Sequence, residues 1–283
     1  MTVACGRCIG CRLEKTRQWA LRCVHEASQN EANAFVTLTY NDASLPTGGT
    51  LDKSAFPAFM KRLRKSQSHR DEFGNHWFRR IRFFACGEYG DRDRRPHYHA
   101  ILFNYYPEDA RLAREKSGNK EALYTSKSLD RLWGLGHCWV GQVSYKSAGY
   151  TARYIVKKIT GDLADEHYRT IDPRTGEVHQ IEPEFALMSR RPGIGFQWFH
   201  KFHTDVYPSD FSIAQGFKSG KPPAYYDKLL DRRDPDMHAM LKAQRASKWQ
   251  DPKVQANNTP ARLAVREEVR TAAINLRSRN VEP

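Results

Sequence analysis

The stretch "WFRRIRFFACGEYGDRDRRPHYHAILFNY" (residues 77–105) contains two apolar segments on either side of a charged turn. Both segments are rich in aromatic and aliphatic residues, which is typical of buried strands, and the polar residues between them are typical of a hairpin turn. We therefore expect residues 77–90 and 96–105 to be neighbouring antiparallel strands. This hairpin decides the fold around it, because it sets the acidic residue of the first strand against the histidines of the second.

Further segments extend this arrangement in both directions. The runs "AFVTLTY" (34–40) and "HCWVGQVS" (137–144) predict two more strands. Helical patterns without internal breakers cover residues 12–29, 51–67, 126–136 and 147–161. Helices interleaved with hairpins predict an α+β fold, with a central antiparallel sheet of about five strands and helices packed on it.

The composition changes near residue 165, where the polar segment "DEHYRTIDPRTGEVHQIEPE" begins. Such a segment is typical of a linker or loop. We expect three parts: a Cys-rich N-terminal arm and helix (1–30), a core domain (31–165), and a partly helical C-terminal extension (166–283).

The chain is strongly basic. Of its 283 residues, 46 are Lys or Arg and 32 are Asp or Glu, which gives a formal net charge of +14. This excess favours a polyanionic partner, and nucleic acid is the first candidate, although basic surfaces also bind membranes and acidic proteins. The N-terminus has no apolar signal core and no segment has the length of a membrane helix, so we expect a cytoplasmic protein without membrane association.

His97 and His99 are two residues apart in the second strand of the hairpin, so both imidazoles point to one face of the sheet. Pairing of the strands can place the carboxylate of Glu88 beside them. One carboxylate and two imidazoles suit Mn²⁺ or Mg²⁺. The alternatives are that the histidines lie on a solvated face and that Glu88 pairs with Arg92 or Arg94 at the surface.

The segment "SAGYTARYIVKK" carries two tyrosines on one helix face. At 100° per residue, Tyr150 and Tyr154 are about 40° apart, and Lys157 lies between them. The alternative is a helix that packs both tyrosines on the core. Combined with a bound cation, the phenols fit metal-assisted attack on a DNA phosphodiester, because nearby positive charge favours the phenolate.

Several motifs together resemble those of a known family. "PHYHAILF" (96–103) resembles the His-hydrophobic-His motif of HUH endonucleases, "FVTLTY" (35–40) their first motif, and "YTARYIVKK" (150–158) their two-tyrosine motif. Their order and spacing are similar to the replication initiators of Microviridae, especially those of the gokushovirus type. The segments "CGRCIGCRLEKTRQWALR" (5–22) and "MSRRPGIG" (188–195) also resemble that family.

The resemblance implies an HUH nuclease fold, which is RRM-like, and a metal-dependent nickase and strand transferase that starts rolling-circle replication of a phage genome. It implies a 5′-phosphotyrosine intermediate, single-stranded and origin DNA as substrates, host helicase and polymerase as partners, and the host bacterial cytoplasm as location. By match, the metal ligands are Glu88, His97 and His99. The alternating nucleophiles are Tyr150 and Tyr154. Lys157 assists them, with Lys158 as a competitor for that role.

The run "CGRCIGC" suits a zinc site. Cys5, Cys8 and Cys11 would supply three thiolates, and Cys23 or His25 the fourth ligand. Free thiols are the alternative.

Arg94, Arg95, Lys158, Arg190 and Arg191 are candidate DNA contacts, and the glycines of the "SRRPGIG" loop would allow a phosphate or the active site to approach the backbone closely. Trp77, Phe78 and Tyr89 could stack on unpaired bases. Two other functions fit the same residues: a noncatalytic DNA- or RNA-binding protein with a zinc module, and an HUH transposase or relaxase.

Overall fold

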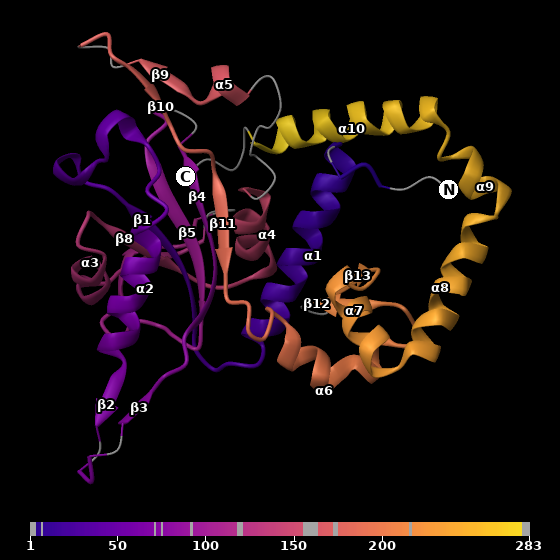
Figure 1. The fold of residues 1–283 in the computed structure, drawn as a ribbon, viewed down its shortest axis with the longest axis horizontal. Coiled ribbons are helices and arrows are strands. Elements are labelled where there is room, and N and C mark those ends of the chain that lie inside the picture. The colour runs from indigo at the N-terminus through magenta and orange to yellow at the C-terminus, as the bar shows by residue number, and fades with distance from the viewer. Residues whose placement is uncertain are drawn as a thin grey trace.

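The computed structural model describes residues 4–6, 8–70, 72–74, 76–90, 93–117, 121–154, 164–171, 175–214 and 217–278. Its centre is a seven-stranded sheet in the order β11-β4-β5-β1-β8-β7-β6, and each neighbouring pair is antiparallel. The strands are β1 (Asn33–Thr39), β4 (Arg82–Tyr89), β5 (Pro96–Phe103), β6 (Arg111–Arg114), β7 (Leu123–Thr125), β8 (Cys138–Gly141) and β11 (Phe185–Met188). The expected α+β fold with a central antiparallel sheet is confirmed (Figure 1).

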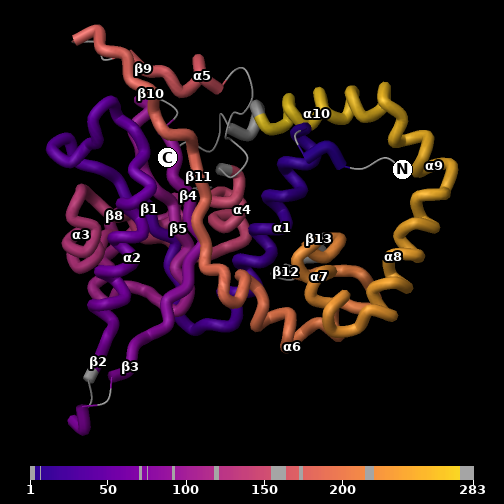
Figure 2. The backbone as a smooth tube through the Cα atoms, in the orientation of Figure 1, coloured from indigo at the N-terminus to yellow at the C-terminus, as the bar shows by residue number. Residues whose placement is uncertain are grey.

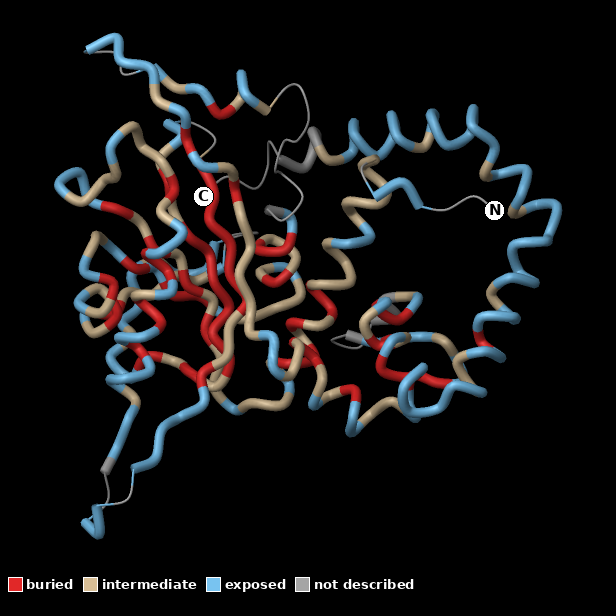
Figure 3. The backbone as a smooth tube through the Cα atoms, in the orientation of Figure 1, coloured by how far each residue is buried: buried red, intermediate tan, exposed pale blue. Residues whose placement is uncertain are grey.

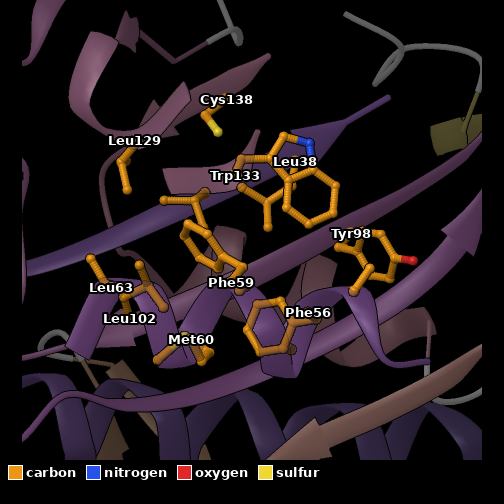
Figure 4. Packing of buried hydrophobic residues seen from close by; sticks show 14 of the residues in the cluster. Leu38, Phe56, Phe59, Met60, Leu63, Tyr98, Leu102, Leu129, Trp133 and Cys138 are labelled. Atoms are coloured by element: carbon orange, nitrogen blue, oxygen red, sulfur yellow. The ribbon is translucent and has the colours of Figure 1, made fainter. Parts of the chain in front are cut away.

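Helices cover both faces of the sheet (Figures 1 and 2). On one face, α2 (Ala55–Ser66) and α3 (Lys127–Trp133) enclose a core that includes Phe56, Tyr98 and Trp133 (Figure 4). On the other face lie α1 (Ile9–Ala27) and α4 (Tyr145–Tyr154). Successive side chains of a strand point to opposite faces, so the odd-numbered residues of β5 face α1 and α4.

Two departures from the sequence predictions concern the edges of the sheet. Residues 77–90 do not form one strand, because β3 (His76–Phe78) pairs with β2 (Ser68–Arg70) in a hairpin that projects from the sheet (Figure 1). The sheet also takes its edge strand β11 from beyond residue 165, so the expected boundary there does not separate the sheet from the rest of the chain. A strand of four residues in a polar region carries too short an alternation to be recognised.

The remaining elements are short or C-terminal: η1 (Asp42–Ser44), η2 (Thr47–Gly49), α5 (Ala164–His167), β9 (Arg169–Ile171), β10 (Val178–Gln180), α6 (Phe196–Val206), β12 (Ser212–Ala214), β13 (Phe217–Gly220), α7 (Ala224–Arg233), α8 (Pro235–Trp249), α9 (Pro252–Ala256) and α10 (Pro260–Ser278). The last three helices form an arc whose residues are mostly exposed (Figure 3). The expected helical C-terminal extension is confirmed.

His25 joins α1 to this C-terminal part. Its ring stacks on Trp198 at 3.5 Å between centroids, and its two nitrogens lie 2.9 Å from the hydroxyl of Tyr226 and 2.9 Å from the carbonyl oxygen of Ile213. Only 3% of the residue is exposed. The imidazole is therefore a structural group, and it is not available as a ligand for the N-terminal cysteines.

The buried His25 gives a pH-dependent stability. Burial lowers the pKa of His25 from 6.5 to about 4, although its hydrogen bond to Ile213 acts in the opposite direction. The unfolded chain therefore takes up a proton at a higher pH than the folded chain. We expect its contribution to be complete above pH 6.5 and to fall by about 3 kcal/mol as the pH decreases to 4.

Urea unfolding between pH 7.5 and 4 measures this change. The free energy of unfolding of the His25→Gln variant should vary less with pH than that of the unmodified protein, by about the same 3 kcal/mol. Equal pH profiles for the two proteins would show that His25 is not the titrating group.

Candidate active site

The strand register places the three predicted metal ligands together. Glu88 of β4 lies directly opposite His97 of β5, and Cys86 lies opposite His99. Oε1 of Glu88 accepts hydrogen bonds from Nε2 of His97 at 2.7 Å and from Nε2 of His99 at 2.8 Å. The two imidazole centroids are 4.9 Å apart, with the rings nearly perpendicular at 89°. The structure therefore forms the predicted cluster of one carboxylate and two imidazoles.

Burial and mutual hydrogen bonding set the charges of this cluster. Glu88 is 2% exposed and His99 is 5% exposed. Burial alone would raise the pKa of Glu88, but the hydrogen bonds from His97 and His99 outweigh it and lower the pKa. Burial would lower the pKa of His97, and the neighbouring Glu88 carboxylate raises it instead. The site thus keeps an ionised carboxylate inside the protein.

Both imidazoles are held by their other nitrogen. Nδ1 of His99 lies 2.8 Å from Oγ1 of Thr37, and Nδ1 of His97 lies 3.1 Å from the carbonyl oxygen of Arg95. A carbonyl can only accept, so Nδ1 of His97 carries the proton and donates it. In the neutral ring, Nε2 then has the free lone pair that a metal requires.

The cluster fits a divalent cation. One ligand atom from each of Glu88, His97 and His99 lies within 4.8 Å of the others. Oε2 of Glu88 is buried and has no hydrogen-bond partner among the residues that the structure describes. A buried carboxylate oxygen is costly without a donor or a cation. An oxygen ligand with two nitrogens suits Mn²⁺ or Mg²⁺.

Tyr150 lies on the same side of the sheet as the histidines. Its ring centroid is 5.0 Å from that of His99 and 6.4 Å from that of Phe35, with interplanar angles of 84° and 87°. Phe35 in turn stacks on His99 at 5.5 Å. Helix α4 therefore brings a phenol against the metal cluster. Tyr154 ends this helix, but its side chain lies outside the described residues, as do Lys157 and Lys158.

Thr37 and Phe35 are residues of the site that the sequence reading missed. Both belong to β1, and Thr37 lies opposite His99 in the sheet. Alternation within "FVTLTY" places them on one face, but only the pairing of β1 with β5 shows that this is the face of His99. That pairing joins residues about 60 positions apart, so no local pattern reveals it.

The predicted DNA contacts fall into two groups. Arg94 and Arg95 lie in the turn beside His97, where Arg94 donates to the carbonyl oxygen of His167 and Arg95 forms an ion pair with Asp42 at 2.7 Å. Arg190 and Arg191 are exposed but remote from the cluster. They follow Met188, which pairs with Phe84, and Phe84 precedes Glu88 by about 13 Å of strand.

The "SRRPGIG" loop is therefore not an active-site contact, which corrects that expectation. Three arginines hold its backbone by donating to carbonyl oxygens: Arg80 to Arg191 at 2.9 Å, Arg82 to Pro192 at 2.8 Å, and Arg22 to Ile194 at 3.0 Å. The loop joins the sheet to α6. This structural function explains the glycines, since Gly195 has a positive φ of 83° and donates its N–H to Glu26.

Three of the four predicted zinc ligands come together. The Sγ atoms of Cys5, Cys8 and Cys11 lie within 4.8 Å of one another. Cys23 does not join them, because it is fully buried between α1 and the sheet, beside Ala20 and Phe84. The expectation for Cys23 is wrong because the helix rises about 18 Å over the twelve residues that separate it from Cys11.

Comparisons with known proteins agree on one family. The family of the replication-associated protein ORF2 matches residues 33–159, which include the cluster and both tyrosines. The replication-associated protein ORF2 of Spiroplasma virus 4 is 34% identical over 242 residues, covering 82% of this chain and 68% of that protein. The replication-associated protein VP4 of Bdellovibrio phage phiMH2K is 30% identical over 260 residues, covering 90% and 77%.

A third relative is more distant. The replication-associated protein ORF4 of Chlamydia phage 1 is 26% identical over 228 residues, which cover 80% of this chain and 53% of that protein. No solved structure matches the chain significantly. Across the part of the chain that the structure describes, every helix is too short or too polar to cross a membrane.

Proposed function

Because the chain belongs to the ORF2 family of replication-associated proteins of Microviridae-type phages, we propose that it initiates replication by cutting and rejoining one DNA strand through a tyrosine. One observation carries this proposal: the ring of Tyr150 packs against His99, a member of the Glu88–His97–His99 cluster. A nucleophile and a cation site that are in contact are what a metal-assisted transfer to tyrosine requires.

In this proposal, Glu88, His97 and His99 hold Mg²⁺ or Mn²⁺. When bound, the cation would polarise the scissile phosphate and stabilise the charge that develops on its oxygens. The protein contributes the orientation of its ligands: Thr37 fixes the ring of His99, and the carbonyl of Arg95 fixes that of His97. The buried position of Glu88 excludes water and strengthens these electrostatic interactions.

The phenol of Tyr150 supplies the nucleophile. Its oxygen forms a bond to phosphorus, the bond from phosphorus to the 3′-oxygen breaks, and that oxygen takes up a proton as a free 3′-OH. The product is a 5′-phosphotyrosine, and its ester bond keeps the free energy needed to rejoin the strand. Tyr154 would perform the second transfer, assisted by Lys157 or Lys158.

DNA contacts are proposed at two places. Arg94 and Arg95 border the cluster and would bind the phosphates next to the cut. At the other end of the sheet, Trp77 and Phe78 are 55% and 68% exposed on the projecting hairpin. Arg80, which is exposed near them, bonds to the backbone of Arg191, so the cations of that loop lie near these aromatic rings. Aromatic rings among cations suit unpaired bases.

Extension of a free 3′-OH requires strand separation and a polymerase. We propose that the host supplies both the helicase and the polymerase, and that the reaction takes place in the host cytoplasm.

The test is incubation of the full chain with Mn²⁺ and single-stranded oligonucleotides that tile the phage intergenic sequence, followed by denaturing electrophoresis. We expect a labelled, protease-sensitive adduct on the 5′ side of one cut, and its loss when EDTA is added. DNA binding without an adduct on any oligonucleotide would instead support a noncatalytic DNA-binding protein.

A further inference from the structure

The N-terminal cysteines form a second cluster, distinct from the one formed by Glu88 and the two histidines. Cys5 and Cys8 precede helix α1, and Cys11 lies in its first turn. The Sγ atoms of Cys8 and Cys11 are 3.5 Å apart, and those of Cys5 and Cys11 are 3.9 Å apart. Three sulfurs thus converge on one point.

These separations distinguish between the possible forms of the cluster. A disulfide would bring two sulfurs to about 2 Å. A cluster of several irons would hold the sulfurs farther apart, because each cysteine binds a different iron. One tetrahedral ion with bonds of about 2.3 Å places its sulfur ligands about 3.8 Å apart. We propose that Cys5, Cys8 and Cys11 bind one Zn²⁺ ion as thiolates.

The backbone between the first two cysteines is shaped for such a site. Gly6 has a positive φ of 74°, which turns the chain back on itself, and a side chain is rarely tolerated in that conformation. The N–H of Cys8 donates to the sulfur of Cys5 at 3.3 Å. N–H donors to sulfur stabilise a thiolate and orient it towards a metal.

Water is the fourth ligand in this proposal. Cys23 lies about 18 Å farther along α1, and His25 is engaged by Tyr226 and Ile213. Among the described residues, the cluster contains no further cysteine, histidine or carboxylate. Three thiolates and Zn²⁺ carry one net negative charge, and the guanidinium of Arg270, which lies beside Gly10, is near enough to offset it.

The site would tie together segments that are distant in sequence. Oε1 of Glu267 on α10 lies 3.4 Å from the N–H of Ile9, and a Cβ added to Gly10 would lie 2.8 Å from Nη1 of Arg270. The same helix α1 packs against α4, where Ala20 contacts Gly149 beside Tyr150. Bound zinc would therefore fix the start of the helix that supports both α10 and the tyrosine helix.

The experiment uses the full chain carrying His97→Ala and His99→Ala, so that the other cluster cannot bind metal. We expect about one zinc per chain by mass spectrometry of the metal, and thiolate-to-cobalt absorption after titration with Co²⁺ alone. Both signals should fall to near zero in Cys5→Ser, Cys8→Ser and Cys11→Ser, and remain in Cys138→Ala. Cys5 is exposed, so its replacement cannot act through lost packing.

Two results would overturn the proposal: absence of the cobalt band from the parent, or its persistence in all three serine variants. Iron–sulfur absorption in the purified protein would also contradict it. The parent lacks the proposed catalytic ligands, so failure of the zinc site and failure of strand cleavage are separate outcomes.

Discussion

Replacing Glu88 with glutamine is expected to lower the rate of strand cleavage about 10³-fold, equivalent to about 4 kcal/mol in the activation barrier. Glutamine has nearly the same shape, so the packing around a residue that is 2% exposed is retained. The substitution removes the negative charge that both imidazoles face, and with it most of the affinity for a divalent cation. Single-turnover formation of the covalent adduct at several Mn²⁺ concentrations measures the effect.

A matched control separates this from general damage to the core. Glu184 is also buried, at 7% exposure, and accepts a hydrogen bond from Tyr168 away from the cluster. Glu184→Gln should leave cleavage within about threefold of the unmodified protein. High Mn²⁺ should partly restore Glu88→Gln. An unchanged rate in Glu88→Gln would exclude Glu88 as a metal ligand.

Replacing Tyr150 with phenylalanine is expected to reduce the first cleavage on the order of 10⁴-fold or more, because the nucleophilic oxygen is removed. The ring contacts with His99 and Phe35 remain, so the fold should be unaffected. Adduct formation on a labelled single-stranded oligonucleotide measures the loss, and peptide mapping of the adduct identifies the modified tyrosine.

Tyr145 provides the control on the same helix. It is half-buried beside Arg17 and Glu14, away from His99, so Tyr145→Phe should cleave normally. Tyr154→Phe should form the first adduct but fail to transfer it to a second strand. A normal cleavage rate in Tyr150→Phe, with the adduct on another residue, would assign the first attack elsewhere.

Sequence alone determined the features that depend on neighbours along the chain. Alternation in "PHYHAILF" put His97 and His99 on one face, and the short turn before it fixed the hairpin that carries Glu88. The helix of Tyr150 followed in the same way from its local pattern. Each of these depends on a period of two or of 3.6 residues, which the sequence displays directly.

The tertiary structure decided which faces meet. Pairing of β1 with β5 placed Thr37 against His99, and packing of α4 on that face of the sheet placed Tyr150 beside the same ring. It also separated Cys23 from the other thiols and moved the "SRRPGIG" loop away from the cluster. These contacts join residues far apart in sequence, and the burial that stabilises them depends on the whole assembly of sheet and helices.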